Sequence, residues 1–393
     1  MLIQQLKVFI ITSVAVFAMA QGAQANAPYC QFDGVEIWTD FPTARVNGCM
    51  QKGDVIHLTI APEVKPINPS PWYAFRVQSQ TTKEVKLVLD YAYGKHRYWP
   101  KVSANGMRWD TLNASKMKLN KDKTQARLSL NVAKDKPLWV AAQEILSSQQ
   151  HNLWMVAQAK KHDFLSLYKL GSSPQGRAIF KLESHRDQND KDAVFLVGRQ
   201  HPPEVTGALA MMPFMETLLA DTDLARSFRA QFRLVMVPNL NPDGVDMGNW
   251  RTNAGGQDLN RDWGPFRQPE TQLMHQELDR FRDNKAGKLA LMLDFHSTHE
   301  NLIYSQSKAE PTDPEGFARD WHGAIRARLP QIAFRNVPSH NAGLPTSKGY
   351  VYKNFGVPAI TYEMGDNSDR GEIRRLAIVA AEEMMKKLLR SKP

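Results

Sequence analysis

Cysteine is scarce in this chain of 393 residues, in which Cys30 and Cys49 are the only two. A cysteine-rich structural zinc site is therefore excluded. If the chain is exported, it meets an oxidising compartment, and we expect one disulfide that pins the N-terminal segment. Two buried free thiols are the alternative, because the sequence does not show how far apart the two side chains lie.

Long apolar runs are missing beyond position 25, so we expect no membrane span in the rest of the chain. The segment 1–25 itself is different. Lys7 precedes an apolar run over residues 8–20, and Ala-Gln-Ala at 23–25 has the small-x-small pattern of a cleavage site. We therefore predict a secretory signal peptide over residues 1–25 and an exported, periplasmic or secreted, protein. An uncleaved membrane anchor is the alternative.

Clusters of basic residues are also missing. The net charge is +10, yet no tract of Lys and Arg is longer than a pair. Such a dispersed charge indicates a solvated basic surface rather than a nucleic-acid patch. The apolar fraction of 42% and the charged fraction of 23% are ordinary for a globular protein. The length is sufficient for two domains.

Residues 26–137 consist of short alternating runs separated by turn residues. The clearest runs cover residues 55–60, 72–77, 83–93 and 126–132. This spacing, almost without helical periodicity, predicts a small antiparallel β-sandwich. No catalytic set is apparent in this region, which we interpret as a packing or substrate-orienting module.

The rest of the chain alternates between strand-like and helix-like runs. Residues 139–159 are predicted as a helix within a connecting segment at 138–164, and a catalytic domain is predicted over 165–393. Its strands are expected at 193–198, 232–237, 289–295 and 358–363, and its helices at 205–219, 270–281 and 372–389. This alternation predicts an α/β domain with a mixed, mostly parallel sheet flanked by helices. In such sheets, ligands bind beyond the carboxyl ends of the strands.

A candidate metal site lies at these strand ends. His201 and Glu204 follow the first strand, and His296 closes the third. Two histidines and one carboxylate leave the fourth coordination position of a zinc ion open for water, as in catalytic zinc sites. Asp294 or a backbone carbonyl is a candidate partner that orients one imidazole. We expect His299 to be a decoy, and the sequence has no His-Glu-x-x-His helix of the common metalloprotease type.

A candidate base closes the last predicted strand. Glu363 ends the mostly apolar run at 358–362. Burial in such surroundings raises the pKa of a carboxyl group, which suits a residue that shuttles protons.

Candidate substrate-binding residues lie on a long loop rich in Gly, Asn and Pro. Arg251, Asn260 and Arg261 stand there, and arginine offers a fork of donors that matches a carboxylate. For each arginine alone, an ion pair with Asp258 or Asp262 is the alternative.

The motifs in their order resemble the zinc carboxypeptidase family that includes carboxypeptidase A. The resemblance covers about residues 165–390. The motifs are Leu170-Gly171-Ser172 with Gly176-Arg177, His201-x-x-Glu204, Asn241-Pro242-Asp243-Gly244, Trp250-Arg251, Asp258-Leu259-Asn260-Arg261-Asp262-Trp263, Asp294-Phe295-His296 and Thr361-Tyr362-Glu363. The β-rich region before them is similar to the branch that includes the cytosolic carboxypeptidases.

The resemblance implies a role for each residue. His201, Glu204 and His296 would hold one zinc ion, and Glu363 would take a proton from the attacking water and return it to the leaving amine. Arg251 would polarise the scissile carbonyl. In the same way, Asn260 and Arg261 would bind the terminal carboxylate of a peptide substrate.

One departure from the family concerns its mobile tyrosine, which pancreatic-type members carry in the segment that precedes the glutamate. Residues 339–342 occupy that neighbourhood here, and His340 is a candidate substitute. Lys348 falls where the family places the pocket for the terminal side chain, which suggests a preference for an acidic terminal residue. A solvated lysine is the alternative.

The sequence therefore predicts a zinc-dependent metallocarboxypeptidase that removes C-terminal residues from peptides. A murein stem-peptide carboxypeptidase or amidase of the same fold is the first alternative. A non-catalytic peptide-binding module is the second.

Overall fold

The computed structural model describes residues 27–184, 191–282 and 287–391. The predicted signal peptide lies outside these ranges. None of the helices within them combines the length and the apolar character that a bilayer span requires.

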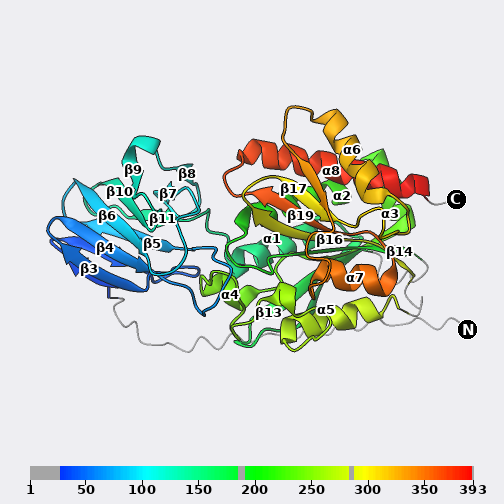
Figure 1. The fold of residues 1–393 in the computed structure, drawn as a ribbon, viewed down its shortest axis with the longest axis horizontal. Coiled ribbons are helices and arrows are strands. Elements are labelled where there is room, and N and C mark those ends of the chain that lie inside the picture. The colour runs from blue at the N-terminus through cyan, green and yellow to red at the C-terminus, as the bar shows by residue number, and fades with distance from the viewer. Residues whose placement is uncertain (1–26, 185–190, 283–286, 392–393) are drawn as a thin grey trace, which may run out of the picture.

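The N-terminal part of the chain forms two facing sheets, with a short 3₁₀ helix, η1 (Ala114–Lys116), in the connection before β9 (Figure 1). Sheet 1 has the strand order β1-β2-β5-β11-β7-β8, and sheet 2 has the order β3-β4-β6-β10-β9. The strands are β1 (Cys30–Phe32), β2 (Val35–Trp38), β3 (Gly48–Lys52), β4 (Val55–Ile60), β5 (Ala74–Ser79), β6 (Lys83–Tyr91), β7 (Lys101–Ser103), β8 (Asp110–Thr111), β9 (Met117–Leu119), β10 (Gln125–Val132) and β11 (Leu138–Ala141). We call this part the β-sandwich.

The pairing in the β-sandwich is antiparallel, as predicted, with one exception. Strand β4 pairs with β6 in parallel. The reason is the path of the chain, which crosses to sheet 1 as β5 before it returns to sheet 2 as β6. Every second residue of β4 is buried, namely Ile56, Leu58 and Ile60. This period of two places the core between the two sheets.

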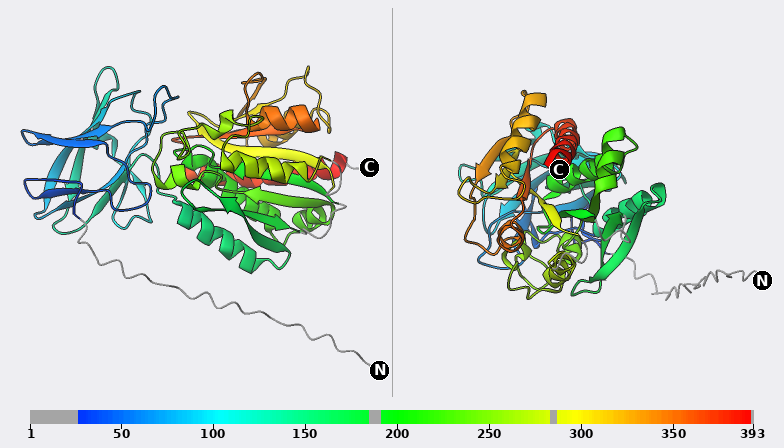
Figure 2. Two further views of the ribbon diagram at one scale, coloured as in Figure 1. Left: turned by 90° about the horizontal axis from the view of Figure 1, so that it is seen from below. Right: turned by 90° about the vertical axis from the view of Figure 1, so that its right-hand side faces the viewer.

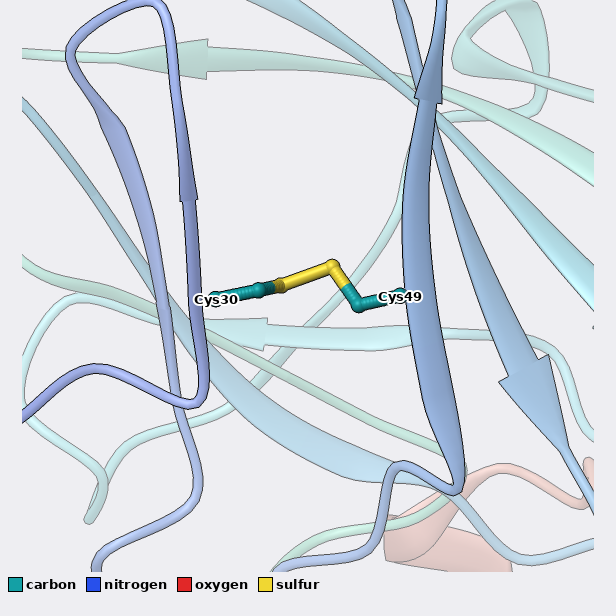
Figure 3. Close-up of a disulfide and its surroundings, with 2 residues drawn as sticks. All are labelled: Cys30 and Cys49. Carbon is teal, nitrogen blue, oxygen red and sulfur yellow. A yellow bond between two sulfur atoms is a disulfide. The ribbon is translucent and has the colours of Figure 1, made fainter.

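Cys30 and Cys49 form a disulfide that joins β1 of sheet 1 to β3 of sheet 2 (Figure 3). The covalent link therefore ties the two layers of the β-sandwich together near the start of the chain.

The predicted helix at 139–159 is wrong over residues 139–147. Leu138–Ala141 form β11, which pairs with β5 and β7. The helix α1 is Ser148–Lys161, and it begins where Ser147 and Gln150 form a capping box. The apolar residues of 138–141 are used in the β-sandwich because the neighbouring strands offer ladder hydrogen bonds there, and a capping box fixes where a helix can begin. Sheet 1 therefore extends to Ala141, beyond the predicted limit at 137.

The second part of the chain is built on sheet 3, with the strand order β12-β13-β15-β14-β16-β19-β17-β18. Its strands are β12 (Leu165–Ser172), β13 (Ala178–Ser184), β14 (Asp192–Gly198), β15 (Phe232–Val237), β16 (Leu289–Thr298), β17 (Leu302–Ser305), β18 (Arg335–Pro338) and β19 (Ala359–Gly365). The four central strands, β15, β14, β16 and β19, are parallel. The predicted mixed, mostly parallel sheet is confirmed. We call this part the α/β part.

Helices cover both faces of sheet 3 (Figures 1 and 2). They are α2 (Val205–Leu219), α3 (Asp223–Gln231), α4 (Pro242–Asp246), η2 (Leu259–Arg261), α5 (Pro269–Asp279), α6 (Phe317–Arg328), α7 (Ser347–Phe355) and α8 (Arg370–Ser391). Val194 and Leu196 of β14 pack in one core with α2 and α8, whereas Phe195 packs in a second core with α5 and α7. A strand buried on both faces is apolar throughout, which explains why the sequence shows β14 as a continuous apolar run.

The two parts of the molecule share a packed contact. Trp250, from the long loop of the α/β part, is fully buried in the core of the β-sandwich. Its indole N–H donates to the carbonyl of Trp72 at 3.1 Å. Arg97 of the β-sandwich forms an ion pair at 2.8 Å with Asp366, which is 2% exposed and follows β19. The β-sandwich is therefore anchored beside the strand ends where a site is expected.

Candidate metal centre and pocket

The three predicted metal ligands meet at the carboxyl ends of β14 and β16. Strand β14 ends at Gly198, and His201 lies in the turn that follows. Glu204 is the residue immediately before α2. His296 lies near the end of β16, which is the parallel neighbour of β14. Residues 95 positions apart in the sequence are thus brought together by adjacent strands.

The ligand atoms face one another in a buried cluster. Nδ1 of His201 lies 2.9 Å from one carboxylate oxygen of Glu204, and Nδ1 of His296 lies 2.7 Å from the other. The two Nδ1 atoms are 3.1 Å apart. One atom from each residue lies within 4.8 Å of the others. Two imidazole nitrogens and a carboxylate oxygen that converge in this way fit a catalytic zinc ion with an open position.

A second carboxylate holds each histidine from its other ring nitrogen. Nε2 of His201 lies 2.9 Å from Asp258, and Nε2 of His296 lies 2.8 Å from Asp294. A proton on Nε2 leaves the lone pair of Nδ1 directed at the centre. Asp294 was predicted for this position. Asp258 was considered only as an arginine partner, although it opens the Asp258–Trp263 motif that the sequence analysis singled out.

Glu363 lies beside the cluster on β19, where it is the register partner of His296. It is buried, and one of its carboxylate oxygens has no hydrogen-bond partner in the structure. Burial and, secondly, the charge of Glu204 raise the pKa of Glu363 to about 8. This matches the pKa expected for a carboxylate that exchanges protons near neutral pH.

Arg251 is held at the pocket from two sides. Its Nε donates at 2.6 Å to Asp258, the same carboxylate that orients His201. Its backbone N–H and those of Trp250 and Thr252 all donate to the carboxylate of Glu63, a residue of the β-sandwich, at 2.7–3.0 Å. The predicted alternative of an ion pair with Asp258 is therefore observed, but the pair is largely buried at the site rather than exposed on the surface.

Asn260 and Arg261 lie in η2 and line the same pocket. The side-chain oxygen of Asn260 accepts the backbone N–H of Ser347 at 2.9 Å, and its amide nitrogen lies 3.3 Å from Nε2 of His296. Arg261 donates to the carbonyl of Asn260 at 2.8 Å.

Lys348 and His340 line another part of the pocket. Lys348 is in α7, 5% exposed, and its ammonium donates to the carbonyl of His340 at 2.8 Å. Burial lowers the pKa of Lys348, and the charge of Glu310 opposes this only in part. The His340 ring stacks on Tyr304, with ring centroids 3.9 Å apart. Tyr304 was not predicted, because it lies in the short strand β17, which has no motif.

The predicted decoy lies away from the cluster. His299 is 79% exposed and lies 3.8 Å from Asp366. Within the described residues, His201, Glu204 and His296 form the group suited to hold a metal ion.

Two residues of the β-sandwich also line the pocket, namely Asn68 and Arg97. No site residue was predicted in the β-sandwich, and we find no sequence motif that could have revealed Asn68 or Arg97. Their place depends on how the two parts pack, not on a local pattern.

Comparisons with known proteins agree with this geometry. A family model described as zinc carboxypeptidase matches residues 151–386. Cytosolic carboxypeptidase 6 of Mus musculus is 30% identical over 154 residues, which cover 37% of this chain but only 28% of the mouse protein.

Solved structures share the fold over almost the whole chain. A metallo-carboxypeptidase from Burkholderia cenocepacia has a TM-score of 0.73 and 19% identity, and the match covers 91% of this chain and 98% of that one. A metallo-carboxypeptidase from Pseudomonas aeruginosa has a TM-score of 0.71 and 23% identity, and covers 90% of this chain and 100% of that one. The family model spans more than half of the sequence, from α1 to α8. The chain belongs to the zinc carboxypeptidase family.

Proposed function

We propose that this protein is an exported metallocarboxypeptidase that releases the C-terminal residue of peptides and favours an acidic terminal residue. The observation that carries the proposal is the convergence of His201, Glu204 and His296 with Glu363 in the neighbouring strand. Membership of the family supports the same activity.

The residues of the pocket divide the work of hydrolysis. Zinc, when bound, supplies a Lewis acid that polarises the scissile carbonyl and acidifies the attacking water. Glu363 takes a proton from that water and delivers it to the leaving amine, a role for which its place on β19 beside the metal cluster suits it. Arg251 stabilises the negative charge that develops on the carbonyl oxygen. Asn260 and Arg261 hold the terminal carboxylate, which makes the enzyme an exopeptidase.

The preference for an acidic terminal residue rests on Lys348. This buried ammonium has a backbone carbonyl as its hydrogen-bond partner, and within the described ranges no carboxylate lies within ion-pair distance of it. A buried charge without a close counter-ion is costly, and a carboxylate from the substrate removes that cost.

Export is supported by two features of the N-terminal region. The segment 1–25 has the pattern of a signal peptide, and the disulfide between Cys30 and Cys49 is of a kind that persists in oxidising compartments. Expression with a C-terminal tag, followed by cell fractionation and N-terminal sequencing, tests this. We expect a mature chain that begins near residue 26; a full-length chain in the cytosol would contradict export.

The activity is tested by release of the terminal residue from peptides that end in Glu, Lys or Phe, with purified muropeptides as a second substrate class. We expect release from ordinary peptides, loss on chelation and recovery with zinc. Glu363→Gln should retain zinc and lower kcat by about 10²–10⁴-fold. Glu315→Gln, which changes an exposed glutamate of the same part, is the matched control. Unchanged turnover in Glu363→Gln would identify a different base, and cleavage of muropeptides alone would favour the murein enzyme.

The acidic preference is tested with Lys348→Met, which keeps the length of the side chain and removes its charge. We expect kcat/KM for peptides that end in Glu to fall at least about tenfold relative to those that end in Phe. Equal rates for Glu and Phe in the unsubstituted protein would remove this part of the proposal.

A further inference from the structure

The β-sandwich contributes directly to the catalytic pocket. Arg97 and Asn68 belong to it, yet both line the same cavity as the metal-binding cluster. The residues assigned above to the terminal carboxylate and the terminal side chain all come from the α/β part. The two residues of the β-sandwich therefore have no role in the proposed reaction.

Arg97 is fixed in place but has bonding capacity left. Its guanidinium donates to both carboxylate oxygens of Asp366, at 2.8 and 3.3 Å, and to the hydroxyl of Ser70 at 2.9 Å. A fourth hydrogen bond, at 3.4 Å, reaches the carbonyl of Ser297, the residue next to His296. A guanidinium has five N–H donors, so one remains for a ligand. The side chain is 13% exposed and lines the pocket, so a guanidinium held by four hydrogen bonds borders the cavity.

The pocket continues into a groove between the two parts of the molecule. A second cavity of about 360 Å³ is lined on one side by Val64 and residues 66–68 of the β-sandwich and on the other mainly by residues 256–258. It shares Asn68, Arg251 and Arg261 with the catalytic pocket. Since the shared edge carries Arg251, assigned to the scissile carbonyl, as well as Arg261, assigned to the terminal carboxylate, the groove borders the reacting part of a bound peptide.

We propose that the β-sandwich supplies the binding site for the peptide backbone upstream of the scissile bond. Arg97 donates its remaining hydrogen bond to the carbonyl of the peptide bond that precedes the scissile one. The amide of Asn68, which is exposed at the junction of pocket and groove, pairs with the backbone of the next residue. The ligand is thus a peptide of three or more residues. This inference rests on the proposed peptidase function.

Substrate length is the direct test. A dipeptide, a tripeptide and a pentapeptide that share their last two residues are compared, since a free dipeptide has no peptide bond upstream of the scissile one. We expect kcat/KM to rise about tenfold from dipeptide to tripeptide in the unsubstituted protein, and this ratio to fall towards one in Arg97→Gln. Arg108→Gln, a change at an exposed arginine of the β-sandwich, should leave both rates and their ratio unchanged.

A second variant guards against a folding defect in Arg97→Gln, because Arg97 also bonds to Asp366. Asn68→Ala removes an exposed side chain and should lower the ratio of pentapeptide to dipeptide about threefold. An equal loss for all peptide lengths, in both variants, would show that the two residues only support the structure and would overturn the proposal.

A binding measurement separates this proposal from the proposed function. Calorimetry on zinc-loaded Glu363→Gln, with and without Arg97→Gln, needs no turnover. Tripeptide affinity that falls about tenfold more than dipeptide affinity supports the subsite even if no peptide is cleaved. Equal affinity for the two peptides in Glu363→Gln would refute the subsite even if the enzyme is a carboxypeptidase.

Discussion

The β-sandwich and the α/β part contribute to one pocket in different ways. The α/β part supplies the groups suited to chemistry, and they stand at the ends of parallel strands, where adjacent strands bring them within hydrogen-bond distance. The β-sandwich supplies single residues from its connecting loops, namely Glu63, Asn68 and Arg97. These three residues contact the loop of Arg251 or the pocket; Glu63 and Asn68 come from the connection between β4 and β5, and Arg97 from the connection between β6 and β7.

This difference teaches how a second domain becomes part of an active site. Glu63 offers one carboxylate to three backbone N–H groups and a hydroxyl of the loop that carries Arg251. Such a carboxylate fixes a loop because several charge-assisted hydrogen bonds must break together. The α/β part would thus hold the reactive groups, while the β-sandwich sets the position of the loop around them.

After the loss predicted for Glu363→Gln, the largest effect is expected inside the α/β part, from the carboxylates that orient the metal ligands. Asp258→Asn should weaken zinc affinity by about 10–100-fold and also lower kcat, because Asp258 holds both His201 and Arg251. Zinc titration with a competing chelator measures the first effect and steady-state kinetics the second. Asp279→Asn, at an exposed carboxylate of α5, is the control. Unchanged zinc affinity in Asp258→Asn would show that His201 is oriented by other contacts.

A smaller effect is expected across the contact between the two parts. Glu63→Ala should lower kcat about tenfold and leave zinc stoichiometry unchanged, because it releases the loop of Arg251 but touches no metal ligand. Glu63→Gln keeps the shape and one acceptor oxygen and should restore part of the loss. Glu84→Ala, at an exposed glutamate of the β-sandwich, is the control. A variant that loses only thermal stability would reduce Glu63 to a packing residue.

The strands of the α/β part were predictable because they are buried on both faces. The runs at 193–198, 232–237, 289–295 and 358–363 are mostly apolar, and each corresponds to a central strand of sheet 3. The short strands β17 and β18 at one side of the sheet were missed, since four residues each are too few to show a clear pattern. Helix α7 was also missed, although it carries Lys348, because its nine residues are too few for a clear apolar stripe.

The metal cluster was predictable because its residues lie at the ends of these predicted strands. His201, His296 and Glu363 each end a recognisable strand, and parallel strands bring their carboxyl ends together. Glu63 and Arg97 were not predictable, since nothing in residues 61–70 or around position 97 reveals which surface of the α/β part they meet. Contacts between separately packed cores depend on the whole fold.

A third prediction concerns the pH dependence of stability in the α/β part. The pKa of Glu363 is raised to about 8 from 4.5. Between these values the folded metal-free protein keeps a proton that the unfolded chain has lost, so its stability falls as pH rises through this window. Glu363→Gln has no ionisable group at this position, so its stability does not fall in this window for that reason. Above about pH 8, the Tm of metal-free Glu363→Gln should therefore exceed that of the unsubstituted protein by several degrees. Near pH 4.5 the two Tm values should become equal. A constant gap would place the cause elsewhere.

The smallest effect on activity is expected from the disulfide of the β-sandwich. Cys30→Ser with Cys49→Ser opens a link across a sequence separation of 19 residues and should destabilise the β-sandwich by about 3 kcal/mol. Since Glu63 and Arg97 lie outside the linked strands, kcat and KM at temperatures well below the Tm should stay the same. Parallel loss of activity and stability would mean that the two sheets must stay linked for the pocket to form.

The most direct measurement of the central claim is a crystal structure of the zinc-loaded protein with anomalous data at the zinc edge. We predict one ion bound by Nδ1 of His201, Nδ1 of His296 and the carboxylate of Glu204 at about 2.0–2.2 Å, with Glu363 beside it. An ion held through Nε2, held by Asp258 or Asp294 instead of Glu204, or located away from Glu363 would contradict the account.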